Sequence, residues 1–257
     1  MKAGNSLERI LAVLQIFSEE RLEWTPEEMM EELGYSRPTL YRYLKTLKEA
    51  GLVASMPNAG FTLGPKVVEM DYLMRKSDPL TLRAAPYLER LSALHPCTAL
   101  VVRWYGGRIL CVDSRCSTAN PLSSYPRGRP MALTRGAIAR SILASLPRRR
   151  LIPLIERDLE EFRALGLGDT VEEVHQAHRQ VKRAGFAVAF GEVTPGVVGI
   201  AAPVFDAGQS PLGSLCVTIA ATLVDEAEIA RIAAEVSGAA RALSADLADG
   251  RTRSTAT

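Results

Sequence analysis

The side chains with the most evident chemistry are basic residues gathered in one short segment. Residues 36–50 carry four basic side chains and one acidic one, whereas residues 6–33 carry eight glutamates against two arginines. The four basic residues are Arg37, Arg42, Lys45 and Lys48. Clustered cations bind the phosphates of nucleic acid, but charge alone fits an ordinary solvated helix face equally well. The hypothesis of DNA binding therefore depends on the element that carries them.

A helix-turn-helix is the element that would position these cations. Thr25, followed by Pro26 and Glu28, is the pattern of a capped helix start. Gly34 favours the left-handed end of that helix, and Ser36 is the expected cap of a second helix. In this motif the second helix lies in the major groove of DNA, with its N-terminal residues at the base edges. Sequence-specific DNA binding is therefore the leading hypothesis.

The expected DNA contacts follow from this placement. Expected at or near the bases are Arg37, Thr39, Tyr41 and Arg42. Expected on phosphates are Ser36, Lys45 and Lys48. Tyr43 lies nearer the apolar stripe formed by the leucines at 40, 44 and 47, so we expect it, rather than Tyr41, to pack in the core.

A first helix and a wing complete the predicted domain. The apolar residues of 7–17 recur at helical spacing, with Ser6 as the expected cap. Residues 52–55 and 61–63 are predicted to be two strands, joined by a turn at 57–60. This ribbon has no lysine or arginine, so we expect it to contact DNA weakly.

The order and spacing of these pieces resemble the IclR family of bacterial transcriptional regulators. The matching segments are Ser-Leu-Glu-Arg-Ile-Leu-Ala-Val-Leu at 6–14, Ser-Arg-Pro-Thr-Leu-Tyr-Arg-Tyr-Leu at 36–44, Leu-Lys-Glu-Ala-Gly-Leu-Val at 47–53 and Phe-Thr-Leu-Gly at 61–64. The similarity continues almost to Gly250. It implies an α+β protein with an N-terminal winged helix-turn-helix, a linker helix and a C-terminal GAF-like mixed α/β effector domain.

Domain boundaries are expected where the pattern changes. We expect a DNA-binding domain over 1–64, linker helices that contribute to dimerisation over 65–95, an effector-binding domain over 96–250 and a disordered tail over 251–257. The linker pattern is helical, with expected breaks at Pro79 and Pro86.

The predicted effector-binding domain alternates strands with helices. Strands are predicted over 98–105, 109–114, 186–190, 197–205 and 214–222, and helices over 135–146, 170–184 and 225–247. We expect these strands to form a mixed sheet with helices packed on it.

The resemblance also implies where a small molecule binds. In the family the pocket lies between the sheet and a loop and helix that here span residues 128–140. The residues transferred in this way are Ser123, Tyr125, Leu133, Thr134, Ala137, Ile138, Ala189, Phe190, Glu192, Gly199, Cys216 and Thr218. Backbone N–H groups at the start of this helix can hold a carboxylate without a charged side chain, whereas ordinary packing of the sheet is the alternative role for the transferred residues.

This sequence departs from the family pattern at two points in the implied pocket. The family's usual Gly-Lys pair is Ala139 and Arg140 here, which puts close backbone approach at that point in doubt. Some members have an acidic residue at the position of Ala189, which is followed here by Phe190. The second departure suggests a less polar or aromatic effector.

Several arginines have more than one expected role. Arg127, Arg129 and Arg135 cluster near the pocket entrance that the resemblance implies, where they would attract an anion or belong to a solvated loop. Arg103, in a predicted strand, has Asp113, Glu192 or a ligand carboxylate as alternative partners.

Signals for catalysis or metal binding are weaker. Glu172, His175 and His178 share one helix face at three-residue spacing, but a solvated surface is the usual reason for such a pattern. Cys111 and Cys116 are either a redox pair or, more commonly, buried thiols. The chain has no nucleophile elbow, zinc-peptidase motif or phosphate-binding glycine loop. We therefore expect no enzyme, metal or cofactor.

The composition is that of an ordinary globular protein. Of 257 residues, 47% are hydrophobic and 23% charged, which suits one large or two modest domains. No apolar run reaches the roughly eighteen residues that cross a bilayer, and no secretory signal is expected. The four cysteines fit neither a zinc site nor a disulfide framework. We expect a cytoplasmic protein with no membrane contact.

These observations lead to one expected function and one alternative. We expect a ligand-responsive, DNA-binding transcriptional regulator that senses a small organic acid or aromatic metabolite. A single helix-turn-helix reads few bases, so the protein should bind double-stranded operator DNA as a homodimer, with a tetramer as the larger alternative. In the alternative function the C-terminal domain only oligomerises and binds no ligand. A pocket filled by its own side chains, with Phe190 inside, would favour that alternative.

Overall fold

The computed structural model describes residues 5–57 and 60–254 of the chain. The chain divides into two compact units, residues 1–78 and 79–257. Each unit has buried apolar clusters of its own. Among the described residues, no helix is both long enough and apolar enough to cross a membrane.

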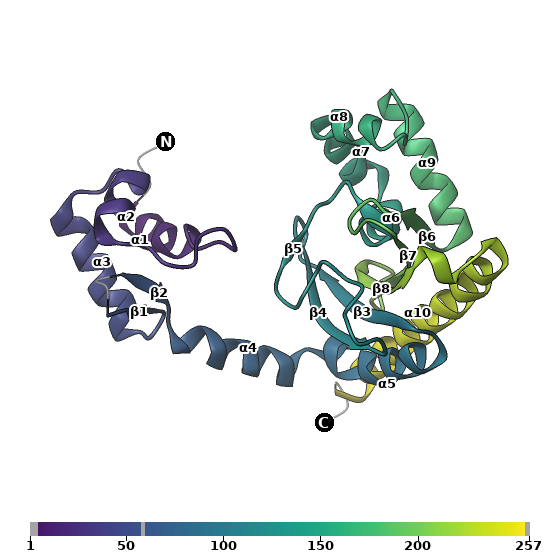
Figure 1. The fold of residues 1–257 in the computed structure, drawn as a ribbon, viewed down its shortest axis with the longest axis horizontal. Coiled ribbons are helices and arrows are strands. Elements are labelled where there is room, and N and C mark those ends of the chain that lie inside the picture. Colours follow the sequence, from purple (N-terminus) through teal and green to yellow (C-terminus); the bar gives the residue numbers. More distant parts are fainter. Residues whose placement is uncertain (1–4, 58–59, 255–257) are drawn as a thin grey trace. The chain divides into compact units, whose positions relative to one another are not determined.

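The first unit consists of helices and a short β-ribbon (Figure 1). Its elements are α1 (Ser6–Gln15), α2 (Pro26–Leu33), α3 (Arg37–Glu49), β1 (Val53–Ser55), β2 (Phe61–Leu63) and α4 (Pro65–Ser77). β1 pairs antiparallel with β2, and Trp24 forms an isolated bridge to Phe61 beside them. The turn predicted at 57–60 falls partly on residues 58–59, which lie outside the described residues.

The cap of α1 is not the expected one. The side-chain oxygen of Asn5 accepts hydrogen bonds from the backbone N–H groups of Leu7 and Glu8, and the Glu8 carboxylate accepts one from the N–H of Asn5. The prediction of Ser6 was wrong by one residue. A glutamate three residues after the cap closes a capping box, and Glu8 stands at that spacing from Asn5.

The helix boundaries inside the helix-turn-helix are confirmed, with one exception. Thr25 and Glu28 form a capping box at the start of α2, and Gly34 ends it with φ of 65°. Ser36 occupies the cap position of α3 without capping it, because its hydroxyl donates to Oγ1 of Thr39 over 3.0 Å.

The second unit consists of one sheet with helices on both faces (Figure 1). Its strands are β3 (Cys97–Trp104), β4 (Ile109–Cys116), β5 (Pro130–Met131), β6 (Ala187–Phe190), β7 (Val197–Phe205) and β8 (Pro211–Ala220). Its helices are α5 (Pro79–Leu94), α6 (Gly136–Ser145), α7 (Arg148–Arg157), α8 (Leu159–Ala164), α9 (Val171–Ala184) and α10 (Glu226–Ser254), with a 3-10 turn at Ala221–Leu223.

The strand order is β5-β4-β3-β8-β7-β6, and every pairing among the described strands is antiparallel. The prediction of a mixed sheet is therefore wrong, because a mixed sheet contains parallel as well as antiparallel strand pairs. Hydrophobic alternation marks which face of a strand is buried but says nothing about the direction of its neighbour.

The two faces of the sheet bury different helices. Leu215, Val217 and Ile219 of β8 pack in the cluster that includes α5 and α10. Cys216, between them in sequence, packs in the cluster that includes α6, α7, α8 and α9. Because side chains alternate across a strand, Thr218 lies on the same face as Cys216. That face carries the candidate ligand pocket.

Three other expectations about the second unit need correction. Pro86 does not break the linker pattern, because α5 continues through it. The tail expected from residue 251 is helical as far as Ser254, and 255–257 lie outside the described residues. Helices α7 and α8 were not predicted, because Pro147 and an interior Pro153 are usually signs of loop structure.

Candidate functional site

The outward face of α3 carries the residues predicted to bind DNA. Its inward face is occupied by Leu40, Tyr43, Leu44 and Leu47, all of them buried. Exposed on the outward side are Ser36, Arg37, Tyr41, Arg42, Lys45 and Lys48, while Thr39 is half-buried. The expected division of the two tyrosines is confirmed, since Tyr41 is 42% exposed and Tyr43 only 4%.

The cations on α3 have weak partners within the chain. Nη2 of Arg37 lies 3.5 Å from Oε1 of Glu27, and Nζ of Lys45 lies 3.9 Å from Oε1 of Glu49. The side chains of both pairs are more than half exposed. Exposed ion pairs of this kind contribute little to stability, so these cations can exchange their partners for phosphates at small cost.

Two buried tyrosines hold α3 in place. The hydroxyl of Tyr43 lies 3.2 Å from that of Ser6 on α1, and its ring meets the ring of Tyr35 edge-on, with centroids 5.9 Å apart. The Tyr35 hydroxyl donates to the carbonyl of Arg9 over 3.0 Å. Sequence patterns give no role to Tyr35, because it lies between two helices and outside any helical apolar stripe.

A cavity lies between the α6 side of the sheet and the segment that leads into α6. Its residues come from the loop before β5, from β5 and the segment after it, from the start of α6, from strands β6 to β8 and from the β6–β7 loop. The lining residues are Ser123, Ser124, Tyr125, Met131, Ala132, Arg135, Gly136, Ala137, Ile138, Ala139, Ala189, Glu192, Val193, Thr194, Val197, Gly199, Cys216 and Thr218. Its volume is about 50 Å³, which is room for a few water molecules.

Small side chains in one row of the sheet make room for this cavity. Gly199 on β7 pairs with Ala189 on β6 and with Thr218 on β8. The three therefore lie side by side on adjacent strands. A Cβ added to Gly199 would reach within 3.7 Å of the Cβ of Ala137 on α6. A larger side chain at position 199 would therefore enter the space between sheet and helix.

The carboxylate of Glu192 occupies the start of α6. Its Oε2 accepts a hydrogen bond of 2.9 Å from the backbone N–H of Gly136, and its Oε1 pairs with Nη2 of Arg140. Arg140 also donates to the carbonyl of Val188 over 3.0 Å. Gly136 has φ of 85°, a conformation that suits glycine. Arg140 stands where the family usually has the lysine of its Gly-Lys pair. Its buried side chain connects α6 to the edge strand β6.

Most of the transferred pocket residues line the cavity, but three do not. Those in the lining are Ser123, Tyr125, Ala137, Ile138, Ala189, Glu192, Gly199, Cys216 and Thr218. Leu133 and Thr134 are outside it, and the Thr134 hydroxyl donates to Glu161 over 2.5 Å. Phe190 is 63% exposed and also outside. It ends the edge strand β6 and follows Ala189, so it points to the opposite side.

Burial keeps two polar side chains of the cavity, the Cys216 thiol and the Tyr125 phenol, in their neutral forms. Burial raises the pKa of the Cys216 thiol and that of the Tyr125 phenol. A neutral thiol is a weak nucleophile. Cys216 and Tyr125 are therefore suited to contact a ligand without reacting with it.

Cys111 and Cys116, the two cysteines of β4, are not joined in a disulfide. Cys111 is buried, and burial raises the pKa of its thiol to about 11. Cys116 is exposed, so its expected burial is wrong. Both are free thiols.

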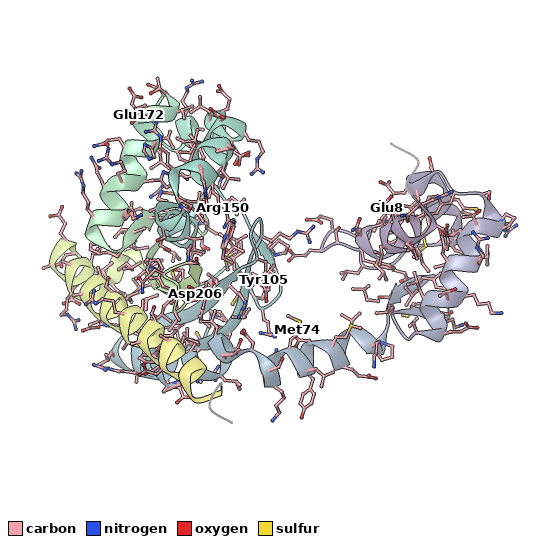
Figure 2. The ribbon with its side chains drawn as sticks, turned by 180° about the vertical axis from the view of Figure 1, so that it is seen from behind. Glu8, Met74, Tyr105, Arg150, Glu172 and Asp206 are labelled. Atoms are coloured by element: carbon pink, nitrogen blue, oxygen red, sulfur yellow. The ribbon has the colours of Figure 1, made fainter. Side chains whose placement is uncertain are left out.

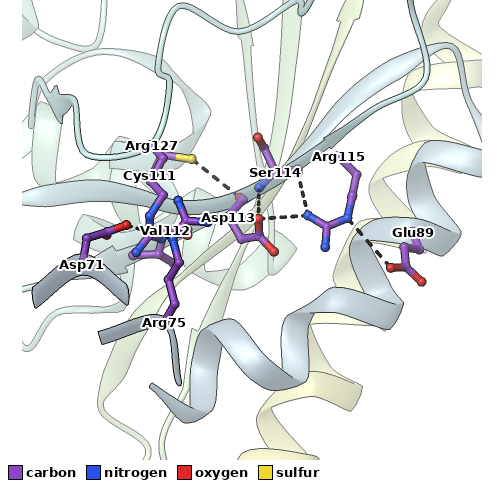
Figure 3. Close-up of polar contacts among 9 residues, drawn as sticks. All are labelled: Asp71, Arg75, Glu89, Cys111, Val112, Asp113, Ser114, Arg115 and Arg127. Atoms are coloured by element: carbon purple, nitrogen blue, oxygen red, sulfur yellow. Dashed lines mark hydrogen bonds and ion pairs between the residues drawn. The ribbon is translucent and has the colours of Figure 1, made fainter. Parts of the chain in front are cut away.

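Asp113 and Glu192, the two protein carboxylates proposed as partners of Arg103, pair with other arginines. Figure 3 shows Asp113 accepting a 2.9 Å hydrogen bond from Nη1 of Arg115, whose Nε lies 3.8 Å from Glu89. Glu192 pairs with Arg140. The Arg103 guanidinium lies 5.7 Å from the ring centroid of Tyr105.

The histidines of α9 are buried rather than solvated. His175 is 8% exposed and His178 is 2% exposed, which corrects the expectation of a solvated helix face. In the part of the chain that the structure describes, no cluster of histidine, cysteine or acidic residues is arranged to hold a metal ion.

Comparison with known proteins identifies the family to which these two units belong. Residues 73–245 match the profile described as bacterial transcriptional regulator IclR C-terminal, and residues 6–57 match the IclR helix-turn-helix domain. The chain belongs to the IclR family. It is a transcriptional regulator of IclR type, and the α+β fold with a helix-turn-helix domain followed by an IclR effector domain is confirmed.

IclR-family relatives cover most of the chain. The HTH-type transcriptional regulator XynR of Escherichia coli (strain K12) is 26% identical over 241 residues, which cover 93% of this chain and 95% of XynR. The Pca regulon regulatory protein of Pseudomonas putida is 29% identical over 227 residues, which cover 87% and 77% of the two chains. A crystal structure of an IclR homolog from Microbacterium hydrocarbonoxydans, complexed with 4-hydroxybenzoate, has a TM-score of 0.75 at 17% identity, with 95% and 99% coverage.

Proposed function

We propose that this IclR-type regulator binds operator DNA through α3 and senses a small organic acid or aromatic metabolite in the cavity beside α6. The observation that carries the sensing half is the cavity itself, which lies over the small residues Ala189 and Gly199 and has Arg135 in its lining. Ligand binding at this place would shift the protein between two conformations that differ in operator affinity.

The charges around the cavity favour an acidic ligand. Glu192 is already paired with Arg140, so its charge is compensated inside the protein. Arg135 has no ion pair within the described residues and lines the cavity. The N–H groups of Ala137 and Ile138 belong to the first turn of α6, where backbone donors are left over and attract anions. We therefore assign recognition of a carboxylate to Arg135 and this first turn.

The apolar lining suits a hydrocarbon or aromatic body behind that carboxylate. Its larger apolar side chains are those of Tyr125, Met131, Ile138, Val193 and Val197. The relatives support this class of ligand, since one regulates the Pca regulon and another structure holds 4-hydroxybenzoate. A cavity of about 50 Å³ is small for an aromatic ring. The segment with Ser123, Ser124 and Tyr125 must therefore move outward to admit one, which would couple binding to a conformational change.

The alternative, in which the second unit only oligomerises, has less support. Its distinguishing feature was Phe190 filling the pocket, and Phe190 is exposed outside it. Dimerisation itself agrees with both functions. Helix α4 has no buried residue, and its Val68 and Leu73 are 73% and 60% exposed. We propose that a second copy covers α4 in a cytoplasmic homodimer on a two-fold operator.

The direct test measures ligand binding and DNA binding on the same full-length protein. A panel of small aliphatic and aromatic carboxylic acids, each with its neutral amide, is screened for a rise in melting temperature. An operator is selected from random duplex DNA, and its affinity is measured with and without each hit. We expect acids, and not their amides, to raise the melting temperature and to change operator affinity.

A matched pair of variants separates sensing from nonspecific stabilisation. Gly199→Ala should keep the response to a hit and Gly199→Leu should lose it, because only leucine fills the cavity. A hit that stabilises both variants equally would bind elsewhere. A hit that stabilises the wild type without changing operator affinity would overturn the regulatory half of the proposal.

A further inference from the structure

We propose that a second cavity, between α7 and α9, binds a phosphate group, with inorganic hydrogen phosphate as the preferred ligand. This cavity is distinct from the one beside α6 and has a volume of about 340 Å³. Glu172 on α9 and Arg150 on α7, both labelled in Figure 2, mark the two helices. The inference does not depend on DNA binding or on the ligand proposed for the first cavity.

Three cations surround the second cavity. Arg148 lies on α7, and Arg179 and Lys182 lie on α9; all three line the cavity and are exposed. Arg148 forms a 3.2 Å ion pair with Glu172, and both side chains of this pair are more than half exposed. Arg179 and Lys182 have no ion pair or side-chain hydrogen bond among the described residues. The cavity thus carries two uncompensated positive charges and a third that is weakly held.

The start of α7 adds a reason for an anion at this place. The helix is ten residues long, begins with Arg148, Arg149 and Arg150, and has no acidic residue in its first turn. The N-terminus of a helix is its positive end and favours negative charge, so three arginines there oppose the usual rule. Pro147, the cap residue, lines the cavity beside Arg148. An anion bound at this point would offset both the helix dipole and the arginines.

A buried histidine without a full set of partners independently indicates a ligand. His178 lines the cavity and is 2% exposed, and its enclosed Nε2 has no hydrogen-bond partner among the residues that the structure describes. Its Nδ1 lies 2.8 Å from the carbonyl of Val174. A carbonyl only accepts, so Nδ1 carries the proton. In the neutral ring Nε2 is then an acceptor, and buried acceptors are normally satisfied.

The tautomer of His178 selects among anions. Burial lowers the pKa of His178, which keeps the ring neutral near pH 7. An anion that satisfies this site must accept hydrogen bonds from Arg179 and Lys182 and donate one to Nε2 of His178. Hydrogen phosphate does both, because it keeps an O–H. Sulfate has the same shape but no proton to donate. A phosphate monoester has lost its proton in the dianionic form that prevails above its second pKa of about 6.

The experiment follows the histidine ring nitrogens of the full-length protein by NMR. The chain has three histidines, so the spectrum of ¹⁵N-labelled histidine is simple, and His178→Gln assigns the resonance of interest. Inorganic phosphate is titrated at pH 7 into the millimolar range, with sulfate and ribose 5-phosphate as parallel arms. We expect phosphate to shift Nε2 of His178 saturably and sulfate to shift it much less.

Ribose 5-phosphate distinguishes the two sources of a phosphate group. Stronger saturable binding of the ester than of inorganic phosphate would assign the site to a phosphorylated metabolite and overturn the preference for hydrogen phosphate. Equal shifts with phosphate and sulfate would show that Nε2 receives no proton from the ligand and would overturn the role of His178.

Charge variants test the cavity without disturbing the fold. Arg179→Gln and Lys182→Gln remove exposed charges that line it, and each should weaken phosphate binding by about tenfold. Arg183→Gln removes an exposed charge from the same helix that does not line the cavity and should leave binding unchanged. An equal effect of Arg183→Gln would show attraction by net charge alone. Either that result or the absence of any saturable shift with the three anions would overturn the proposal.

Discussion

The carboxylate of Glu192 accepts a hydrogen bond from the backbone N–H of Gly136 at 2.9 Å. A residue of the β6–β7 loop thus occupies the helix start at which a ligand carboxylate was expected. The N–H groups that we assign to a ligand are those of the next two residues of α6, Ala137 and Ile138. Arg135 is the adjacent cation. Glu192 is therefore better understood as part of the wall that shapes the cavity than as a group that binds the effector.

Removing the charge of Glu192 should destabilise the second unit. Its partner Arg140 and Glu192 itself have side chains only 11% and 16% exposed. Breaking such a buried pair leaves a charge uncompensated and costs about 3 kcal/mol. We expect Glu192→Gln to lower the free energy of unfolding in urea by about that amount. Combined with Arg140→Met, it should cost less than the sum of the two single changes. Additive losses would mean that the pair contributes nothing.

Filling the cavity should abolish sensing without loss of the fold. A Cβ at position 199 makes only an ordinary contact with Ala137 at 3.7 Å, so Gly199→Ala should change stability by less than about 1 kcal/mol. The longer chain of Gly199→Leu occupies the ligand space. Isothermal titration with an effector found in the screen should give wild-type affinity for the alanine variant and no binding for the leucine variant.

Arg42 should contribute to sequence recognition rather than to general affinity. It is exposed on α3, and a bidentate contact of arginine with guanine is worth about 1–3 kcal/mol. We expect Arg42→Ala to weaken operator binding by that amount in fluorescence anisotropy, with a smaller change on random duplex DNA. Lys48→Ala should weaken both DNAs alike and reduce the salt dependence. Equal weakening of both DNAs by Arg42→Ala would assign it to the phosphate backbone.

The two neighbouring tyrosines of α3 should behave in opposite ways. Tyr43→Phe removes the 3.2 Å contact with the Ser6 hydroxyl and should lower the free energy of unfolding of the first unit by about 1 kcal/mol. Tyr41→Phe changes an exposed side chain and should leave that stability unchanged while weakening DNA binding. Chemical denaturation followed by circular dichroism, with anisotropy on operator DNA, measures both effects.

His178 should make stability depend on pH below neutrality. Burial lowers its pKa from the ordinary value of 6.5, so on acidification the unfolded chain takes up the proton before the folded protein does. Stability is then complete above pH 6.5 and falls as the pH drops through that value, by up to about 1.4 kcal/mol per pH unit. Unfolding measured between pH 5 and 8 should show this slope in the wild type and a smaller one in His178→Gln. Identical slopes would show that another group is responsible.

Predictions from the sequence succeeded where the signal is local. Thr25 and Gly34 mark the start and end of α2, and Thr170 and Gly185 mark those of α9. In both helices the structure has a capping box at the start and a left-handed glycine at the end. Each signal depends on one or two adjacent residues and on backbone conformations available before the chain folds. The cap of α1 was missed because Asn5 and Ser6 are both good caps, and only their spacing to Glu8 separates them.

Tertiary structure decided the properties that depend on distant segments. Ala189, Gly199 and Thr218 become one small-residue row only through the register of three strands. Phe190 lies outside the pocket because it follows Ala189 on β6, so its side chain points to the opposite side of the sheet, where it is exposed. Glu192 meets Gly136 and Arg140 across more than fifty residues of chain. The sequence by itself therefore determined the helix-turn-helix, its cationic face and the family. The shape and charge of both cavities were decided by packing, because no local preference specifies which side chains meet.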